Sequence, residues 1–365
     1  MRGPVLVVGP VEPPIGGVSR YCRSLVDLLR ADGLDAVPLD PDRPASGSPV
    51  SFGRALDRPL GRLLGGGTLA LSRAVRGHGA RLVVDNRQAL WREPASARGA
   101  RLLLHVPHVL AIHDGAFPQF VAGLGESARR RLARDLGRLS GVLCMSDAIV
   151  EAIARIVPAA RAFRLEPLLR PPDRASSLPA EIEAFFAEPG PVLCASGALH
   201  PQYGLEDLLS AVAALRRSGR PARLVLLLGT FVDDPSTAEA VRRTRARLGA
   251  GAILPLSDFA DGASIIARSQ LYVRPSRVDS YGMALHEAML LGVPVVASAH
   301  PTRPEGIFTY RAGDIDGLAK AIESGLAPEA RSEAVASVPR HRATVEANAR
   351  RTLEILAGFY AEAAA

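Results

Sequence analysis

The sequence predicts an α/β protein built from two doubly wound domains that face one another. Short apolar runs alternate with amphipathic stretches along the whole chain, a pattern typical of parallel sheets covered by helices. The alternation breaks once, at EPLLRPPDRASSLP (166–179), where four prolines and two serines indicate a linker. A chain of 365 residues is long enough to bury a core on each side of that break.

The N-terminal domain is expected to cover residues 1–167. Its buried parallel strands are predicted at PVLVVG (4–9), RLVVD (81–85), RLLLH (101–105), VLAIH (109–113) and GVLCM (141–145). After the first of these strands, one helical face collects Val18, Cys22, Leu25, Val26 and Leu29. Ser146 is placed to cap another helix, which runs to Val157 and has Asp147 in its first turn.

The second domain is expected over residues 180–342, after a linker at residues 168–179. The alternation predicts its strands at PVLCAS (191–196), ARLVLLLG (222–229), GAILPL (251–256), QLYVRP (270–275) and GVPVVAS (292–298). Residues 343–365 read as a C-terminal helix, which is expected to pack back on the N-terminal domain. In such sheets ligands bind beyond the carboxyl ends of the strands, so the loops after the strands are the candidate sites.

Composition narrows the class of protein and its partners. There is no run of eighteen or more uncharged apolar residues that would span a membrane, and the start MRGPVLVVGPVEPP reads as a first strand and its loop instead of a signal peptide. Three separated cysteines without metal spacing favour a cytoplasmic protein with buried thiols. The formal charge of +7, carried by arginines with Lys320 as the only lysine, favours anionic partners such as nucleotide phosphates or phospholipids. Nucleic acid fits less well, because no binding signature for it is present.

Two loops of the N-terminal domain hold candidate residues. Gly16 and Gly17 open a helix after the first strand, where bare backbone can approach a ligand. The spacing of neither a dinucleotide fingerprint nor a P-loop is present there. His113 ends a strand and Asp114 begins the following loop. A histidine in this place can line a site or be a satisfied core residue, and the sequence leaves both readings open.

The strongest signal is PSRVDSYGMALHEAMLLGVPVVAS (275–298), which reads as a loop, a helix and a strand. The first free amides of this helix, at residues 282–284, are expected to form an anion site. Met283 and Glu287 share a helical face, so Glu287 can reach past a bound phosphate and accept hydrogen bonds from a ribose diol. Asp279, before the glycine, is expected to face whatever the phosphate carries. The spacing therefore suits a ligand linked to a nucleoside diphosphate.

The same segment resembles the retaining glycosyltransferases of the GT-B fold, family 4. The likeness rests on two acids with seven residues between them and on G-x-x-x-x-EA-x-x-x-G-x-PVVAS, and it extends over most of the chain through PIGGVSRYCRSLVDLLRADGLDAV, AIHDG, VLCMSDAIVEAI and RPEG followed by GDIDGLAKAI. The resemblance implies two Rossmann-like domains facing a central cleft. It also implies transfer of a sugar from a UDP- or GDP-sugar to an acceptor hydroxyl, in surface polysaccharide, glycolipid or natural-product glycosylation.

The resemblance further implies which residues form the site. Catalytic roles fall on His113, Asp114 and Asp279. Donor-binding roles fall on Gly16, Gly17, Gly197, Tyr203, Arg277, Ser280, Tyr281, Gly282, Met283, Ala284, Glu287 and Arg303. No metal is expected, because the helix dipole and arginines would stabilise the leaving diphosphate. The pair Asp314 and Asp316 is expected to cap a helix instead of binding a metal.

One departure from the family pattern concerns charge. Ala198 and Tyr203 stand where the family commonly has an arginine and a lysine that neutralise the donor diphosphate. Arg303, or failing it Arg277, is expected to supply that charge, with Tyr203 as a neutral hydrogen-bond donor. Arg274 is expected to contribute less, because it still belongs to the strand. The alternative reading is a catalytically silent homologue that acts as a partner or scaffold.

Two arginine-rich stretches raise the question of a membrane. ESARRRLARDLGRL (126–139) places arginines beside leucines, and SFGRALDRPLGRLL (51–64) is also basic. Together they could dock on an anionic membrane or on a lipid-linked acceptor. A solvated helix face over an ordinary core stripe is the favoured alternative for these stretches. The expected location is the cytoplasm, with peripheral contact at the inner face of the membrane as a further option.

Overall fold

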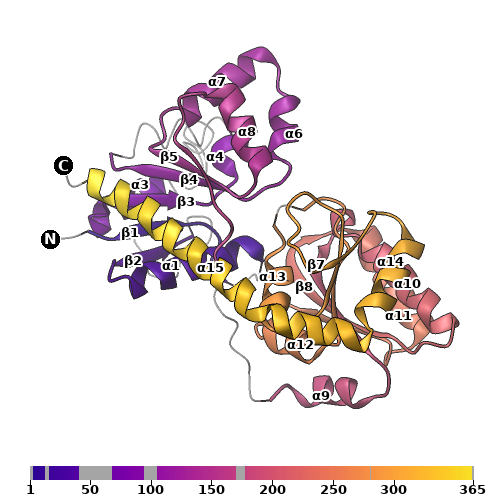
Figure 1. Ribbon diagram of the computed structural model, residues 1–365. Coiled ribbons are helices and arrows are strands. Elements are labelled where there is room, and N and C mark those ends of the chain that lie inside the picture. Colours follow the sequence, from indigo (N-terminus) through magenta and orange to yellow (C-terminus); the bar gives the residue numbers. More distant parts are fainter. Residues whose placement is uncertain are drawn as a thin grey trace. The chain divides into compact units, whose positions relative to one another are not determined.

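The structure is a computed structural model that describes residues 3–12, 16–40, 68–93, 105–169, 177–279 and 281–363. Its contacts divide the chain into two compact units (Figure 1). The first unit comprises Met1–Glu12, Val18–Leu168 and Glu346–Ala365, and the second comprises Pro13–Gly17 and Leu169–Val345. Each unit is built on one six-stranded sheet in which neighbouring strands pair in parallel. The predicted pair of α/β units is therefore confirmed.

The sheet of the first unit has the order β2-β1-β3-β4-β5-β6. Its strands are β1 (Val5–Val8), β2 (Ala36–Leu39), β3 (Leu82–Asp85), β4 (His108–Ile112), β5 (Gly141–Cys144) and β6 (Ala162–Arg164). The helices between them are α1 (Gly17–Ala31), α3 (Thr68–His78), α4 (Ala89–Arg92), α6 (Phe117–Ala122), α7 (Glu126–Leu136) and α8 (Asp147–Ile156). Helix α3 packs on β1 and β3, and helices α4, α6, α7 and α8 pack on β4 and β5.

The sheet of the second unit has the order β12-β11-β10-β7-β8-β9. Its strands are β7 (Val192–Leu199), β8 (Arg223–Asp233), β9 (Ile253–Ser257), β10 (Leu271–Arg274), β11 (Val295–Ser298) and β12 (Phe308–Tyr310). Its helices are α9 (Ala180–Ala187), the 3₁₀ turn η1 (Pro201–Tyr203), α10 (Leu205–Arg217), α11 (Pro235–Leu248), α12 (Gly262–Arg268), α13 (Met283–Leu290) and α14 (Ile315–Gly325). The strand order reverses between β7 and β10, which places the switch point of the sheet there.

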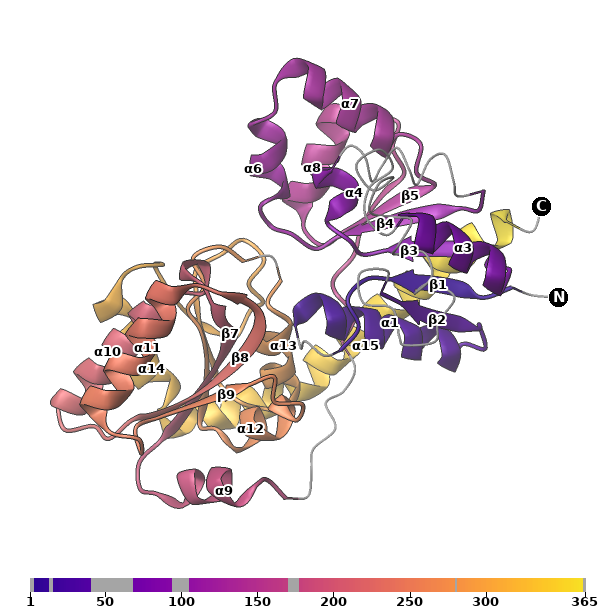
Figure 2. The ribbon, with the colours of Figure 1, turned by 180° about the vertical axis from the view of Figure 1, so that it is seen from behind.

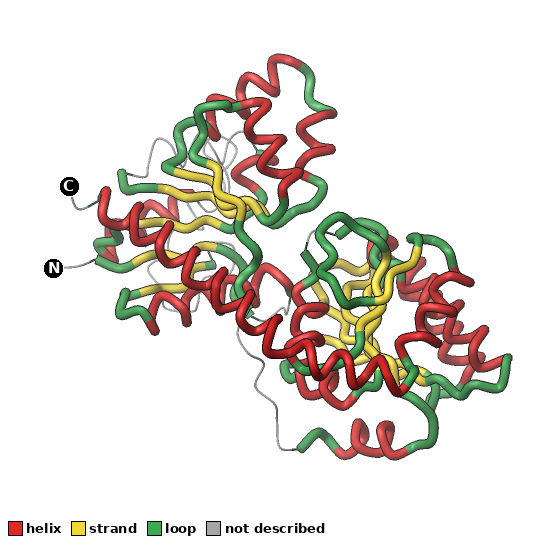
Figure 3. The backbone as a smooth tube through the Cα atoms, in the orientation of Figure 1, coloured by secondary structure: helices red, strands yellow, loops and turns green. Residues whose placement is uncertain are grey.

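Helices cover both faces of the second sheet, which is why its strands read as continuous apolar runs. One face packs against α10, α11 and α14, which lie together in both Figure 1 and Figure 2. The other face packs against α9, α12 and α13. Figure 3 shows the strands of each unit in the interior with helices around them. Asp314 caps α14 as expected, because its Oδ1 accepts from the amide of Gly317 at 2.8 Å.

The last helix, α15 (Pro328–Glu362), begins in the second unit and ends in the first. In the first unit, the fully buried ring of Phe359 fills the space in front of Gly141, where a Cβ would lie 2.4 Å from the Cζ atom of the ring. Tyr360 Oη donates to the carbonyl of Gly3 at 2.6 Å. The C-terminal turns of the helix are therefore part of the packing of the first unit.

The structure differs from the sequence reading at several elements. Strands β2, β6 and β12 were not predicted; they are only three or four residues long, and each has positions that are partly or fully exposed. Helix α15 begins at Pro328, well before the predicted start at residue 343. It continues through Pro339, although proline usually ends a helix. The strand expected at residues 101–105 lies almost wholly outside the described residues. The expected cap of α8 is confirmed, since Ser146 Oγ accepts from the amide of Ile149.

The three cysteines, Cys22, Cys144 and Cys194, are free thiols in the interiors of the units. Burial raises the pKa of Cys22 and of Cys144 to about 12 each. Burial also raises the pKa of Cys194. All three are therefore protonated and weakly nucleophilic while the protein is folded.

Candidate functional site

The candidate site lies at the switch point of the second sheet, where a doubly wound fold binds ligands beyond the carboxyl ends of its strands. Strands β7 and β10 are direct neighbours there, with Leu193 opposite Leu271. The loop after β7 contains Tyr203, the loop after β10 contains Asp279, and the loop after β11 contains Arg303. Side chains from three loops therefore meet beside the start of helix α13.

Helix α13 begins directly after Gly282, as the sequence predicts. Gly282 has φ 78°, in the left-handed region that glycine adopts without strain, and it caps the helix without a side chain. A Cβ at this position would lie 3.2 Å from Arg303 Nη1 and 3.3 Å from Asp279 Oδ2. The glycine therefore lets these charged groups approach the end of the helix whose first amides have no intrahelical acceptor.

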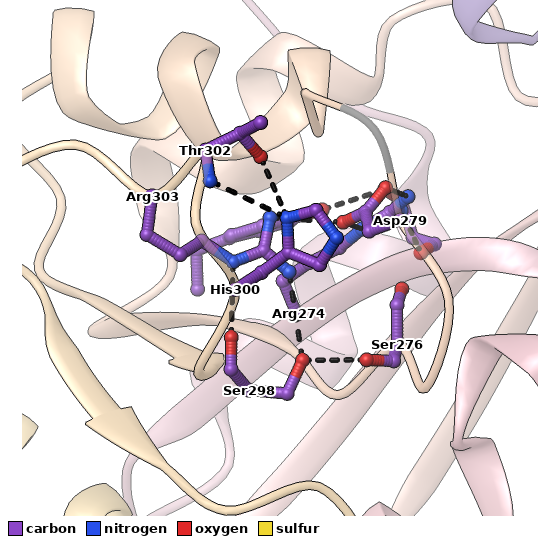
Figure 4. A network of polar contacts seen from close by, with 9 residues as sticks. Arg274, Ser276, Asp279, Ser298, His300, Thr302 and Arg303 are labelled. Atoms are coloured by element: carbon purple, nitrogen blue, oxygen red, sulfur yellow. Dashed lines mark hydrogen bonds and ion pairs between the residues drawn. The ribbon is translucent and has the colours of Figure 1, made fainter. Parts of the chain in front are cut away.

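Asp279 is held between two arginines at this helix end (Figure 4). Arg274 donates from Nη2 to Asp279 Oδ1 at 2.9 Å and from Nε to Oδ2 at 3.0 Å, and Arg303 Nη1 lies 2.9 Å from the same Oδ2. The side chains of Asp279 and Arg303 are only 6% and 4% exposed. Burial alone would raise the pKa of Asp279, but Arg274 and Arg303 outweigh burial and hold this pKa well below its usual range. Two guanidinium groups and one carboxylate leave the cluster with a net positive charge.

Arg274 is positioned from the β7 side. Its Nη1 donates to the carbonyl of Ser196 at 3.0 Å, and its Cζ atom lies 5.5 Å from the centroid of the Tyr203 ring. The same ring lies against Gly197, where a Cβ would come within 2.9 Å of it. The glycine and the tyrosine that the sequence singled out thus form the support of an arginine in the strand end.

Arg303 is positioned from the β11 side. Its Nε donates to the carbonyl of Ser298 at 3.0 Å, and Ser298 Oγ donates to the carbonyl of Ser276 at 2.5 Å. Ser276 is only 3% exposed, and within the described part of the chain its own Oγ has no hydrogen-bond partner. Figure 4 shows this side chain pointing toward the side of the network on which Asp279 lies. A buried hydroxyl without a partner is costly, so this atom is suited to a ligand oxygen.

His300 adds a neutral donor next to Arg303. Its Nδ1 lies 2.9 Å from Thr302 Oγ1 and 3.4 Å from the Thr302 amide nitrogen. Since an amide N–H can only donate, Nδ1 accepts and the ring proton is on Nε2. Burial and Arg303 lower the pKa of His300, although Asp279 opposes the shift. The imidazole is therefore neutral and presents an N–H group.

Glu287 lies one turn into α13 from Met283 and is buried, with 7% of its surface exposed. Near it, the ring of Tyr281 stacks on His286 with centroids 3.9 Å apart and planes 3° apart. His286 Nδ1 lies 3.3 Å from His341 Nε2 of α15. Burial, with His341 and Arg303, lowers the pKa of His286 to about 3, so this stack stays uncharged. The stack fixes the start of α13 against α15.

Of the three arginines considered from the sequence, Arg303 and Arg274 contact Asp279. Arg277 does not, because its Nη2 donates to Asp207 Oδ1 at 2.8 Å, and its side chain is 44% exposed. Arg274 reaches Asp279 although it belongs to the strand. The reason is the length of its side chain, which carries the guanidinium past the end of β10. Ser280, another expected donor-binding residue, lies outside the described residues.

In the first unit, His113 follows β4 and is half-buried. Asn86 Nδ2 donates to the carbonyl of Val8 at 3.0 Å, which directs Asn86 Oδ1 to His113 Nε2 at 2.9 Å. Because Oδ1 can only accept, Nε2 carries the proton and Nδ1 keeps a lone pair. The ring of Tyr21 lies edge-on at 4.4 Å, and burial lowers the pKa of His113 to about 4. His113 is therefore a neutral imidazole with a defined tautomer.

The other residues expected in the loops after β1 and β4 lie near the starts of helices, although Gly16 and Gly17 themselves group with the second unit. Asp114 Oδ2 accepts from Arg92 Nη2 at 2.6 Å, and its Oδ1 accepts from the amide of Ala116 at 2.9 Å. Gly17 is the first residue of α1, and a Cβ there would meet no atom of the described residues within 4 Å. Gly16 directly precedes this helix.

Sequence reasoning gave Arg274 a smaller role than Arg303 and Arg277, and it missed Ser276, His300 and Asn86. Ser276 and His300 lie in the loops after β10 and β11, and Arg274 is the last residue of β10, so their position at the carboxyl ends of the strands was the available signal. Asn86 directly follows β3, so the same rule would have selected it. Which of these side chains meet could not be read from that rule, because it locates loops and not side-chain contacts.

The arginines of the stretch at residues 126–139 lie on the surface of α7 and just after it, and Leu132 and Leu136 are buried. The leucines thus belong to the core stripe of the unit. The other basic stretch, at residues 51–64, lies outside the described residues. None of the described helices combines the length and the hydropathy needed to cross a membrane. Within the described ranges, no group of three or more His, Cys, Asp or Glu side chains is arranged to hold a metal ion.

The sequence resembles known proteins within its second unit and over most of its length. Residues 190–327 match a family model described as "Glycosyl transferases group 1". A glycogen synthase of Mycobacterium tuberculosis is 25% identical over an alignment of 385 residues, gaps included. The alignment covers 93% of this chain and 90% of that protein. A D-inositol 3-phosphate glycosyltransferase of Segniliparus rotundus is 28% identical over 134 residues, which cover 36% of this chain and 29% of that protein.

Solved structures resemble the whole chain. HepE of Anabaena in complex with UDP-glucose superposes with a TM-score of 0.73 at 19% identity, covering 98% of this chain and 100% of that chain. Sucrose-phosphate synthase of Thermosynechococcus elongatus superposes with a TM-score of 0.72 at 20% identity, covering 99% and 100%. These neighbours are GT-B glycosyltransferases. The chain therefore has the GT-B fold. The match within its second unit to the glycosyl transferases group 1 supports the assignment of glycosyltransferase activity.

Proposed function

We propose that the chain is a retaining glycosyltransferase of family 4, which moves a sugar from a nucleotide diphosphate sugar to an acceptor hydroxyl. The observation that carries the proposal is the placement of Arg274 and Arg303 at the N-terminus of α13, with Glu287 one turn further on. Backbone amides and guanidinium groups suit a diphosphate, and a carboxylate beside them suits a ribose diol. HepE was solved with UDP and with UDP-glucose, so a UDP-sugar is the first donor to test and a GDP-sugar the second.

In this proposal the donor diphosphate lies on the first amides of α13. The amides of Gly282, Met283 and Ala284 face its oxygens, and the helix end supplies about half a unit of positive charge. As the glycosidic bond breaks, the diphosphate gains negative charge that the amides alone do not balance. Arg303 and Arg274 supply the remainder in a buried setting, where charge interactions are strong.

The arginines thereby replace the basic pair that the family pattern places at Ala198 and Tyr203. Tyr203 contributes by supporting Arg274 through its ring, and Gly197 by leaving room for that ring. Tyr281 holds the start of the helix through its stack on His286. The proposed donor site is therefore built from one arginine at a strand end and another in the loop after β11.

For the first unit we propose an acceptor-side catalytic role of His113, with Asp114 beside it. Gly16 and Gly17, which group with the second unit, are proposed to contact the donor through their bare backbone. The support for the role of His113 is its neutral imidazole, whose Nδ1 lone pair is left for a hydroxyl or sugar oxygen while Nε2 is bound by Asn86. Full transfer activity in a folded His113→Ala variant would show that this ring has only a structural role. The acceptor is proposed as a lipid-linked saccharide, a polysaccharide or a small molecule, and the protein as a cytoplasmic one with peripheral membrane contact.

The proposal is tested by nucleotide binding and by turnover. Donors are screened by thermal shift, since a ligand that binds the folded state raises its melting temperature, and the best donor is then assayed for hydrolysis and transfer. We expect Glu287→Ala to weaken binding of the corresponding nucleoside diphosphate by about tenfold or more, equivalent to about 1.4 kcal/mol, because the ribose diol loses its acceptor. Glu333→Ala, an exposed position of α15, is the matched control.

The outcomes separate the two readings of the chain. Unchanged nucleoside diphosphate affinity in a folded Glu287→Ala variant contradicts the role of Glu287. If the protein binds donors but neither hydrolyses nor transfers the sugar, whichever donor and acceptor are supplied, the result favours a catalytically silent homologue. The absence of the family's basic pair is the reason for that alternative. Turnover with inversion at the sugar's anomeric carbon, read by NMR of the product, contradicts the retaining assignment.

A further inference from the structure

We propose that Asp279 is an internal substitute for the donor phosphate: its carboxylate occupies, in the ligand-free protein, the position on Arg274 and Arg303 that the diphosphate takes when the donor binds. This inference rests on the proposed function and adds an exchange of anions to it. Binding of the donor displaces the carboxylate, and the displaced Asp279 is then free to face the sugar. The observations that carry it are the contacts, the anchoring and the charges of this cluster.

The contacts show a carboxylate in the place of a ligand oxygen. Both oxygens of Asp279 are bound by guanidinium groups at 2.9 to 3.0 Å. One of them lies 3.3 Å from the point in front of Gly282 where any other residue would carry its Cβ. The carboxylate therefore sits where the backbone at the start of α13 is bare, which is the approach that a phosphate would use.

Each arginine has an anchor other than Asp279. Arg274 is held by the carbonyl of Ser196, and Arg303 is held by the carbonyl of Ser298. A guanidinium group has five N–H donors in a fixed fork, so each arginine can keep its carbonyl contact and still bind a second anion. The buried Oγ of Ser276, which has no partner in the described part of the chain, is a further donor for that anion.

The charges show why the two anions exclude one another. Two arginines and one aspartate leave one unit of positive charge. This is smaller in magnitude than the negative charge of a diphosphate. A phosphate group bound beside an undisplaced Asp279 would place like charges within a few ångströms in a buried site, where their repulsion is strong. Displacement removes this repulsion, and the diphosphate then meets both arginines.

The test is the neutral variant Asp279→Asn, with UDP and inorganic pyrophosphate as probes. Without the internal anion, we expect UDP to bind about tenfold more tightly than to the wild type, and pyrophosphate to raise the melting temperature by more than it does in the wild type. The ligand-free variant is expected to melt at a lower temperature, because two buried arginines have lost their counter-ion. Sugar transfer is expected to fall. UDP is used without a sugar so that a lost sugar contact does not affect the affinity.

The matched control is Asp207→Asn, which also frees an arginine of the second unit, Arg277, from its ion pair. We expect no gain in UDP affinity there. Equal or weaker UDP binding by folded Asp279→Asn overturns the exchange, and a gain in Asp207→Asn instead assigns the diphosphate to Arg277 and overturns it too. If the wild type binds no nucleoside diphosphate, the proposed function itself fails, which is a different result from wild-type binding without the gain.

A second measurement is made on the wild type and does not depend on whether Asp279→Asn folds. The ¹³C-carboxyl resonance of Asp279, identified by its absence from the spectrum of Asp279→Glu, is followed during titration with UDP. We expect it to shift as the carboxylate leaves the arginines. A resonance that stays in place while UDP saturates the protein would show that the carboxylate remains bound, and the exchange would be wrong.

Discussion

Arg274, at the end of β10, and Arg303, in the loop after β11, reach the same carboxylate, and each is also held by a backbone carbonyl. A buried charge is tolerated only where it is paired and hydrogen-bonded, and the two arginines meet that condition through Asp279, Ser196 and Ser298. These contacts offset the desolvation free energy of the two buried arginines before any ligand binds. Side chains held in this way need little reorganisation when negative charge develops nearby.

We therefore expect Arg303→Ala and Arg274→Ala each to lower turnover with the correct donor by at least roughly tenfold, or about 1.4 kcal/mol of barrier. The reason is the loss of positive charge beside the leaving diphosphate. Steady-state kinetics on folded variants measures the effect, and Arg277→Ala, whose side chain is paired with Asp207 and half-exposed, is expected to change turnover less. If neither Arg303→Ala nor Arg274→Ala changes turnover, charge compensation by this cluster is wrong.

His113 gives a prediction about pH. The unfolded chain takes up a proton near the ordinary histidine pKa of about 6.5, whereas burial lowers the pKa of folded His113 to about 4. Between these values the unfolded state binds more protons, so the free energy of unfolding is full above about pH 6.5 and falls as the pH is lowered toward 4. We expect His113→Gln to flatten this dependence and His78→Gln, at an exposed position of α3, to leave it unchanged.

The fluorescence of Trp91 measures this, since it is the only tryptophan and lies in the first unit. Denaturant titrations between about pH 4 and 7 then report the first unit. An equally steep pH dependence in His113→Gln would contradict the assignment of the neutral ring to the folded state.

At the residue scale the sequence was informative wherever spacing alone decides the geometry. Glu287 lies one turn behind the helix start because four residues make about one turn, and Gly282 ends the loop because it takes a positive φ. Spacing did not decide between Arg274 and Arg277. That choice depends on which carboxylate each arginine meets. Asp279 lies in the loop after β10 and Asp207 in the first turn of α10, and only the folded sheet brings these segments together.

At the scale of elements, the start of α13 combines a left-handed turn with a close approach of charged side chains. We expect Gly282→Ala to lower the melting temperature and also to weaken nucleotide binding, because the new Cβ would press on Arg303 and Asp279 at 3.2 and 3.3 Å. Gly313→Ala is the matched control, since Gly313 has φ 82° and no atom of the described residues lies within 4 Å of its Cβ position. The control carries the same backbone strain, of about 1–2 kcal/mol.

Thermal unfolding and UDP binding of both variants decide the point. A nucleotide affinity that falls equally in Gly282→Ala and Gly313→Ala would trace the effect to backbone strain and not to the contacts in front of α13. Both variants are expected to lose stability, so only the difference in binding between them is informative about the site.

Elements with strong patterns could be predicted, and weak ones could not. The central strands β1, β4, β7 and β10 are buried on both faces and read as apolar runs. Strands β2 and β12 lie at sheet edges, where one neighbour is missing and exposed positions break the run. Helix α15 extends well before its predicted start, because Pro339 resembles a stop signal although the helix continues through it.

At the scale of the whole chain, the C-terminal turns of α15 complete the first unit although they are the most distant in sequence from its first strand. We expect Phe359→Ala to destabilise the first unit by about 3–5 kcal/mol, the usual cost of emptying a buried phenylalanine site, because the ring is fully buried against Gly141. Tyr360→Phe, which removes only the hydrogen bond to Gly3, is expected to cost about 1 kcal/mol.

Denaturant unfolding followed by Trp91 fluorescence compares the two variants in the unit concerned. A loss below about 1 kcal/mol for Phe359→Ala, far under the usual range for such a site, would mean that the helix end does not pack on the first unit. The sequence indicated a C-terminal helix, but the partner of Phe359 could not be derived, since nothing in the spacing identifies Gly141 as the residue that leaves room for its ring.

The three buried thiols allow the opening of each unit to be measured separately. Cys22 and Cys144 belong to the first unit and Cys194 to the second, and a thiol reagent reaches a buried, protonated sulfur only after the surrounding structure has opened. The rate at which each cysteine is alkylated under native conditions therefore measures how often its own unit opens. Mass spectrometry of the alkylated peptides would yield two separate opening free energies from one sample of unmodified sequence, including the change that a bound nucleotide produces in each unit.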